Sequence, residues 1–284
     1  ASATGGRSIA TGTAANASGA YSIATGFTAA AAGENSIAQG KGAIAGAENS
    51  IAIGKSATAS GISIGNEALT GIADSIAIGH KSKVDGGAEG VAIGNEATNG
   101  EASFAAAVGA TSEANANYSA ALGYSAVADA EFSVALGAAS KAGDDFVESR
   151  SAEVNGVKYE GFAASTSGFG PGAVVSVGKA GSERQIKNVA AGQVTKVSTD
   201  AINGSQLYAV ASRVADALAT KINKQHWNVG NNDGAVVSGV YHEDQVNFVN
   251  GNVTTVKVVK APSKSSTPDG GPNVTNVSYD VNVG

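Results

Sequence analysis

The chain has 284 residues, 39 glycines, no cysteine, no methionine, 5% aromatic residues and a formal net charge of −6. Few aromatic residues and many glycines argue against a conventional globular core, and the mild negative charge argues against nucleic acid or an anionic membrane as the main partner. The lack of cysteine excludes disulfides, zinc-thiolate sites and thiol nucleophiles, and no apolar run is long enough to span a bilayer. Because the sequence starts within a repeat and without methionine, we expect a piece of a longer chain, with any membrane anchor outside it.

A repeated pentapeptide, Ser-Ile-Ala-x-Gly, fills the first half of the chain. Its ten copies end at Gly12, Gly26, Gly40, Gly54, Gly65, Gly79, Gly94, Gly109, Gly123 and Gly137, with gaps of 14, 14, 14, 11, 14, 15, 15, 14 and 14 residues. A period this short indicates the coils of a solenoid, which bury one another. We therefore predict a mainly β fold with a parallel β-roll over residues 1–143. Each coil would have two short strands and two turns, stacked at roughly 4.8 Å per coil.

Side chains within the pentapeptide alternate between two faces of a strand. The second position is aliphatic in most coils, from Ile9 to Val134, and the fourth is mostly Ile, Val or Leu. The third position is alanine in nine of the ten coils, and Ser63 is the exception. Because a flat alanine face permits close approach, we interpret it as a subunit interface. The alternative is a monomeric solenoid with a bland alanine face.

Four aromatic residues stand directly before pentapeptides, at outer positions near the turns. They are Tyr21, Phe104, Tyr118 and Phe132. We consider them candidate ligand contacts, and the alternative is corner packing between coils.

The pattern changes after the repeats. Residues 144–181 are predicted as an irregular connector with one strand-like piece, Val174 to Gly178, and residues 182–206 form a distinct segment. Thr199 or Asp200 is a candidate helix N-cap. A narrow apolar stripe then predicts a helix over 207–225 that self-associates as a coiled coil; docking on its own domain is the alternative. The stripe consists of Leu207, Val210 or Ala211, Val214, Leu218 and Ile222.

Residues 227–284 show strand patterns and are predicted as a small, separate β module. Val246 and Phe248 alternate with polar residues, and Asn250-Gly251-Asn252 is a hairpin-type turn. Trp227, the only tryptophan, follows the helix directly, where three copies could cluster around an axis.

No catalytic, cofactor or metal site is expected. The three histidines, His80, His226 and His242, lack metal-ligand spacing, and no Ser-His-Asp constellation can be argued. An ice-binding solenoid would need a threonine ladder, which Gln39 interrupts. A pectin-lyase-type enzyme would need longer coils and a charged groove.

These segments together resemble the passenger of a trimeric autotransporter adhesin of Gram-negative bacteria. The pentapeptide repeats resemble the YadA-like head, a left-handed parallel β-roll. The segment from Glu183 to Leu207, with Arg-Gln-Ile-Lys-Asn-Val-Ala-Ala-Gly and Thr-Asp-Ala-Ile-Asn-Gly-Ser-Gln-Leu, resembles that family's neck. Residues 227–284 resemble a β-prism module of the Trp-ring or GIN type, on Trp227 and the run Asp244 to Phe248.

The resemblance implies an obligate homotrimer on the bacterial cell surface, anchored in the outer membrane by a C-terminal barrel absent from this sequence. It implies neck or interface roles for Arg184, Gln185, Asn188, Asp200, Asn203, Gln206, Leu207, Val214, Leu218 and Trp227. Two departures stand out: Thr11, Thr25 and Gln39 replace aliphatic residues in the first coils, and the helix is too short for a stalk. We expect it to link two head modules.

The resemblance further implies an adhesin and not an enzyme. It would bind a host cell receptor or matrix protein such as collagen, fibronectin or laminin, with avidity from three copies. The alternatives are a spacer that only projects a distal binding tip and a monomeric β-solenoid of another role.

Overall fold

The chain forms two units, Ala1–Ala201 and Ile202–Gly284, which we describe separately. The structure is a computed structural model that describes residues 1–143, 147, 149–163, 173–224, 226–230, 236–241, 254–257 and 278–281. Exposure of side chains is described as far as residue 221.

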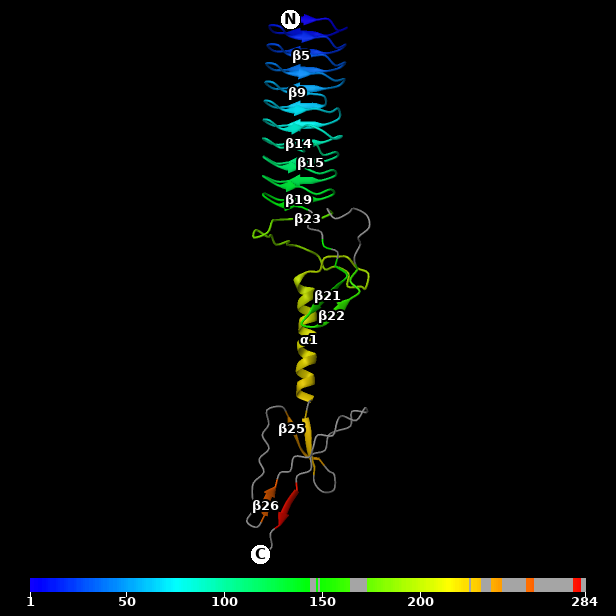
Figure 1. Cartoon of the computed structure of the whole chain (residues 1–284), viewed down its shortest axis with the longest axis vertical. Helices are drawn as coiled ribbons and strands as arrows, with labels where there is room; N and C mark the ends of the chain where they lie inside the picture. Colours follow the sequence, from blue (N-terminus) through cyan, green and yellow to red (C-terminus); the bar gives the residue numbers. More distant parts are fainter. Residues whose placement is uncertain are drawn as a thin grey trace. The chain divides into compact units, whose positions relative to one another are not determined.

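The first unit contains a β-roll with two layers of parallel strands (Figure 1). One layer is an eleven-stranded sheet of β2 (Ile9–Thr11), β4 (Ile23–Thr25), β6 (Ile37–Gln39), β8 (Ile51–Ile53), β10 (Ile62–Ile64), β12 (Ile76–Ile78), β14 (Val91–Ile93), β15 (Ala106–Val108), β17 (Ala120–Leu122), β19 (Val134–Leu136) and β23 (Val175–Ser176). Each of the first ten strands is the centre of one pentapeptide, so the predicted solenoid is confirmed.

The second layer consists of two-residue strands. They are β1 (Ser2–Ala3), β3 (Asn16–Ala17), β5 (Ala30–Ala31), β7 (Ile44–Ala45), β9 (Thr58–Ala59), β11 (Leu69–Thr70), β13 (Lys83–Val84), β16 (Glu113–Ala114), β18 (Val127–Ala128) and β20 (Lys141–Ala142). Bridges from Thr98 to Lys83 and Glu113 link the seven strands before it to the three after it. The layer therefore runs along the whole roll.

The interior of the roll is built almost entirely from alanine. The third-position alanines from Ala24 to Ala135 are fully buried, and they pack against the buried alanines of the second layer, such as Ala31 and Ala45. The prediction that this alanine face is a subunit interface is therefore wrong. A coil this flat leaves room for little more than methyl groups between its layers, so the small face turns inward.

Each regular coil contains two residues in the left-handed backbone region, one at each turn. In the fourth coil these are Asn49 with φ 57° and Ser56 with φ 55°. The glycine that closes the pentapeptide, here Gly54, has φ 134°, and a Cβ on it would lie 2.2 Å from the carbonyl oxygen of Gly65 in the next coil. Backbone conformation and close approach both explain the repeated glycine.

The 11-residue coil between Gly54 and Gly65 closes by a buried hydroxyl network. Ser63 Oγ lies 3.0 Å from Thr70 Oγ1, and Thr70 Oγ1 also accepts the backbone N–H of Gly61 at 3.0 Å. Ser63 Oγ donates to the carbonyl oxygen of Thr58 at 2.8 Å. These bonds satisfy polar groups that the shortened turn leaves inside the roll.

The connector is more regular than predicted. An antiparallel hairpin, β21 (Ser151–Val154) and β22 (Val157–Glu160), lies within it, and the strand-like piece at Val174 to Gly178 forms β23, paired with β19. Residues 143–173 are thus inserted before a last strand of the eleven-stranded sheet. The degenerate sequence Val-Val-Ser-Val-Gly concealed an eleventh copy of the pentapeptide.

The second unit begins with helix α1 (Gly204–Lys224). After it come β24 (His226–Gly230) and β25 (Val236–Tyr241), which pair antiparallel, and β26 (Thr254–Lys257) and β27 (Ser278–Val281), which also pair antiparallel. The predicted strands at 246–248, the turn at 250–252 and His242 lie outside the described residues. None of the described helices is long and apolar enough to cross a membrane.

Candidate interaction surfaces

The outer face of the eleven-stranded sheet carries two columns of aliphatic side chains. They come from the second and fourth pentapeptide positions, and several count among the exposed large hydrophobic residues of the chain: Ile9, Ile23, Ile93, Val108, Leu122 and Leu136. The others, such as Ile51 and Ile76, are half-buried. We call this surface the aliphatic face. The fourth position is Thr11, Thr25 and Gln39 in the first three strands, so both columns are apolar from β8 onward. An extended apolar face of this kind is typical of an interaction site.

The outer side of the second layer is mixed, with charged Lys83, Glu113 and Lys141 as well as the exposed Ile44. Lys141 forms an ion pair with Asp129 at 3.3 Å, and Asn115 Nδ2 donates to Asp129 Oδ1 at 2.9 Å. The second layer thus carries charged side chains on its outer side, which the strands of the aliphatic face lack.

Three of the four predicted aromatic contacts form one stack. The rings of Phe104 and Tyr118 lie 5.3 Å apart, and those of Tyr118 and Phe132 lie 4.9 Å apart, with interplanar angles of 6° and 2°. All three residues have a positive φ, between 55° and 61°. Phe104 and Tyr118 remain about half exposed, at 47% and 49%. The rings thus pack between coils and also present their edges to the surface.

The fourth residue, Tyr21, lies apart from that stack at the opposite end of the roll. Arg7 Cζ is 5.5 Å from the Tyr21 ring centroid, and Arg7 Nη1 donates to the Tyr21 hydroxyl at 3.2 Å. Sequence reasoning placed all four residues at equivalent positions, but it could not show which of them meet.

Arg184 caps the C-terminal end of the roll. Its Nη1 donates to the carbonyl oxygen of Val177 at 2.7 Å and to Ser140 Oγ at 3.0 Å, and its Nη2 donates to the carbonyl oxygen of Ala138. Beside it, backbone N–H groups of Glu183 itself and of Gly181 hold the pKa of the Glu183 carboxyl below its ordinary value. The predicted neck role of Arg184 thus includes covering open carbonyl groups.

The neck segment of the first unit has few contacts within one chain. Gln185 and Asn188 are exposed, and Asp200 Oδ2 accepts the backbone N–H of Gln193 at 2.9 Å. Val194 and Val197 are both 79% exposed. A single chain therefore leaves apolar neck side chains uncovered.

Helix α1 starts with a capping box. Asn203 Oδ1 accepts the backbone N–H of Gln206 at 3.3 Å, and Gln206 Oε1 accepts that of Asn203 at 3.1 Å. The prediction of Thr199 or Asp200 as the N-cap is wrong, because the chain turns helical only at Gly204. Asn203 and Gln206, expected as neck residues, are the pair that starts the helix.

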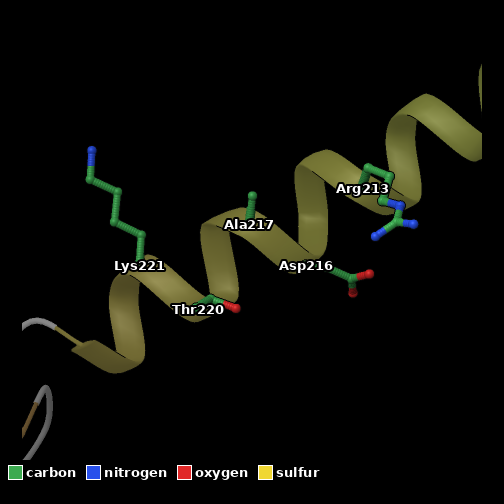
Figure 2. Close-up of a pocket in the computed structure, with 5 residues that line it drawn as sticks. All are labelled: Arg213, Asp216, Ala217, Thr220 and Lys221. Carbon is green, nitrogen blue, oxygen red and sulfur yellow. The ribbon is translucent and has the colours of Figure 1, made fainter.

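The predicted apolar stripe of α1 is uncovered. Leu207, Val214 and Leu218 are all exposed in the single chain. A shallow hollow elsewhere on the helix is lined by Arg213, Asp216, Ala217, Thr220 and Lys221, and Figure 2 shows that all of them project from this one helix. A hollow with walls from a single helix does not enclose a small molecule.

An exposed apolar surface that the sequence reasoning missed lies on the hairpin. The cross-strand pairs Ala152–Tyr159 and Val154–Val157 share one face, and the charged pair Glu153–Lys158 lies on the other. All eight strand residues are exposed. The signal was present as alternation in Ser151–Glu160, but a two-stranded ribbon needs a cover for its apolar face.

Within the described ranges there is no cluster of three or more metal-ligating side chains. His80 Nδ1 lies 3.0 Å from Asn95 Oδ1, and His226 begins β24. Trp227 lies on β24 opposite Val240.

Two family models match segments within the first 226 residues of the chain. The YadA head domain repeat matches residues 3–29, 31–57, 45–63, 73–97, 102–126 and 114–140, and the coiled stalk of trimeric autotransporter adhesin matches residues 185–226. The autotransporter adhesin BtaE of Brucella suis biovar 1 (strain 1330) is 40% identical over 74 residues, which cover 26% of this chain and 10% of that protein.

Two solved structures are similar as well. The collagen-binding domain of the Yersinia adhesin YadA is 31% identical, with 70% of this chain and 87% of that chain covered and a TM-score of 0.45. The C-terminal YadA-like domain of BPSL2063 from Burkholderia pseudomallei is 33% identical, with 53% and 50% covered and a TM-score of 0.29. By its head repeats and its stalk segment, the chain belongs to the YadA-like trimeric autotransporter adhesins.

Proposed function

We propose that this chain is the head and neck of a surface adhesin that works as a homotrimer and attaches a bacterium to host cells or extracellular matrix. The observation that carries the proposal is the aliphatic face, which extends along most of the roll and is open in a single chain. Two further copies of the chain, parallel around one axis, would cover it.

The neck and the helix support the same assembly. The exposed Val194 and Val197 of the neck and the exposed Leu207 and Leu218 of α1 each need a partner. A narrow stripe of this kind is buried when parallel helices form a coiled coil. The match of residues 185–226 to a coiled stalk agrees with that arrangement.

Attachment by many weak contacts follows from a repetitive, threefold surface. Three identical heads held in one trimer raise the effective concentration of each binding site for an elongated ligand. The family places such proteins at the cell surface with an outer-membrane anchor, which we propose for the whole protein here. Within the family, the Yersinia adhesin YadA has a collagen-binding domain, so collagen is the first ligand to test, with fibronectin and laminin as comparisons.

The aromatic stack of Phe104, Tyr118 and Phe132 is the proposed ligand contact. Its rings are held in fixed, parallel orientation and are half exposed, so a ligand would lose little side-chain entropy on contact. Tyr21, although isolated from the stack, offers an equivalent surface beside Arg7. The second candidate function is a spacer that projects a distal tip, and it is favoured by the packing of these rings on one another.

The assembly is tested first by light scattering over a dilution series of the purified chain. A mass of three chains that persists on dilution supports the proposal, and a monomer at all concentrations contradicts it. Attachment is tested next with immobilised collagen, fibronectin and laminin. Tyr118→Ala and Phe132→Ala should weaken binding by the trimer, with Tyr124→Ala as the exposed aromatic control. Unchanged binding by both variants would favour the spacer.

The predicted β-prism of the Trp-ring or GIN type stays a proposal for residues 227–284. The antiparallel pairs β24–β25 and β26–β27 agree with a β module. In the proposed trimer, Trp227 would follow the coiled coil in all three copies.

A further inference from the structure

Two neighbouring strands of the eleven-stranded sheet, β6 and β8, carry opposite charges at their two ends. Glu34 precedes β6 and Lys41 follows it, and Glu48 precedes β8 and Lys55 follows it. All four side chains are exposed. We call the side of the roll with Glu34 and Glu48 the leading edge, and the side with Lys41 and Lys55 the trailing edge.

Within one chain, residues of like charge lie next to each other in neighbouring coils. The backbone N–H of Asn49 donates to the carbonyl oxygen of Glu34 at 2.9 Å, and that of Ser56 donates to the carbonyl oxygen of Lys41 at 2.9 Å. Glu48 therefore lies one coil from Glu34, and Lys55 lies one coil from Lys41, at a spacing of roughly 4.8 Å. Like charges so close repel each other.

Opposite charges at the two edges are too far apart to relieve that repulsion in one chain. Glu34 and Lys41 are separated by the whole strand β6, and seven extended residues span roughly 20 Å. Among the described residues, the ion pairs are Lys83–Asp85 and Lys141–Asp129, both on the second layer. Each edge therefore needs opposite charges from another chain to relieve the repulsion between its own like charges.

We propose that the acidic leading edge of one copy pairs with the basic trailing edge of the next copy around the trimer axis. This rests on the trimer of the proposed function and adds the residues that orient it. A closed ring needs two different surfaces that fit one another. The two ends of the same strand supply them at the same height, so Glu34 would meet Lys41 of a neighbour, and Glu48 would meet Lys55.

The same pairing sets the vertical register of the copies. The second position is isoleucine in every strand from β2 to β12, so burial of this column alone would tolerate a slip by one coil. A slip by one coil would pair Glu34 with Lys55 and leave Glu48 and Lys41 without partners. Electrostatic complementarity of this kind selects register more than it adds affinity.

The test is a reversal of each edge followed by a reversal of both. Glu34→Lys with Glu48→Lys makes both edges basic, and Lys41→Glu with Lys55→Glu makes both acidic. Light scattering on dilution should show that the concentration for half-dissociation rises about tenfold or more in each double variant. The fourfold variant restores opposite edges and should return to within about threefold of the original chain, with all differences smaller in 1 M salt because of screening.

A matched control separates edge charge from net charge. Glu113→Lys with Glu160→Lys, on the second layer and on the hairpin, changes the net charge by the same amount as Glu34→Lys with Glu48→Lys and should leave dissociation unchanged. Lys41 Nζ also lies 5.9 Å from the Phe27 ring centroid, so Lys41→Glu removes a second contact. The variant with Glu34→Lys and Glu48→Lys is therefore easier to interpret. If a double variant fails to form trimers, the fourfold variant should form them again, because each of its copies carries one acidic and one basic edge.

Two results would overturn the pairing while the trimer itself stands. They are double variants that dissociate like the original chain, and a fourfold variant no better than the doubles. A monomeric original chain would instead contradict the proposed function, and the edge pairing with it.

Discussion

The guanidinium group of Arg184 lies next to Gly137, the last pentapeptide glycine before the insertion of residues 143–173. A Cβ on Gly137 would lie 3.5 Å from Arg184 Cζ, whereas a Cβ on Gly123 would lie 2.5 Å from the carbonyl carbon of Gly137. In each earlier coil, the backbone of the next pentapeptide glycine occupies the space that the Arg184 guanidinium occupies beside Gly137. A solenoid end needs a cap because its last coil has no neighbour, and Arg184 provides one.

Arg184→Ala should loosen the end of the roll. The carbonyl groups of Val177 and Ala138 would lose a charged donor, which costs about 2 kcal/mol. Hydrogen exchange should become faster at amides of β19 and β20 and stay slow in β4 and β6. Arg184→Lys should rescue the loss only in part, because an ammonium lacks the planar fork of donors. Equal exchange along the whole roll in both variants would contradict the cap.

Gly54→Ala should destabilise the roll. The added Cβ would lie 2.2 Å from the carbonyl oxygen of Gly65, and φ of 134° is strained for alanine. We expect a loss of about 1–3 kcal/mol in the free energy of unfolding, measured by chemical denaturation. Gly6→Ala is the control, since a Cβ there meets no atom within 4 Å. Similar stability of the two variants would show that the coils adjust to the extra group.

Thr70→Val should destabilise the 11-residue coil although the side chains are similar in shape. Thr70 Oγ1 accepts the N–H groups of Ser60 and Gly61 and lies 3.0 Å from Ser63 Oγ. Valine leaves these buried groups without that partner, at a cost of about 1–3 kcal/mol. Thr25→Val, on the outer face, should change the midpoint of urea denaturation little. A neutral Thr70→Val would mean that water replaces the hydroxyl.

Tyr118→Asn tests the aromatic stack without straining the turn. Asparagine tolerates the left-handed region, so φ of 57° can be kept while both ring contacts are lost. Two such contacts contribute about 1–3 kcal/mol together, so the melting temperature should fall. Tyr124→Asn should leave it nearly unchanged. A stable variant with lost ligand binding would separate a binding role from a packing role.

Asn203→Ala should weaken the start of α1. The alanine cannot accept the N–H of Gln206, and loss of an N-cap costs about 1 kcal/mol. Circular dichroism at 222 nm should show less helix at intermediate temperature. Asn203→Asp is the conservative control and should retain the helix, since a carboxylate also caps. If Asn203→Ala and Asn203→Asp behave alike, the capping box contributes nothing measurable.

Much of the fold could be predicted because the repeat is strict. Glycine spacing identified the ten coils, and alternation within the pentapeptide identified the two faces of each strand. The strand at Val174 to Gly178 was predicted, but its place in the eleven-stranded sheet was not, since the inserted residues 143–173 and Val174 in place of serine obscure its register. The helix was located by its apolar stripe, but its start was misplaced because Thr199, Asp200 and Asn203 are all good capping residues.

The candidate surfaces were predicted only in part. Tyr118 and Phe132 share a sequence position, and the coil rise places their rings within stacking distance. Tyr21 shares that position too, yet its neighbours along the edge are Arg7 and Asn35, so no aromatic stack forms there. Local position was readable from the repeat, whereas the partner of each side chain depended on which coil lies next to it.

The sequence by itself determined the period of the coil, the place of each turn and the existence of one aliphatic and one alanine face. Only the tertiary structure decided which face is inside. Alternation with a period of two assigns side chains to opposite sides and is silent on which side is enclosed. Closure of a coil of 14 residues brings the two layers so near that Ala24 and Ala31 fill the space between them, and Ile23 must point outward.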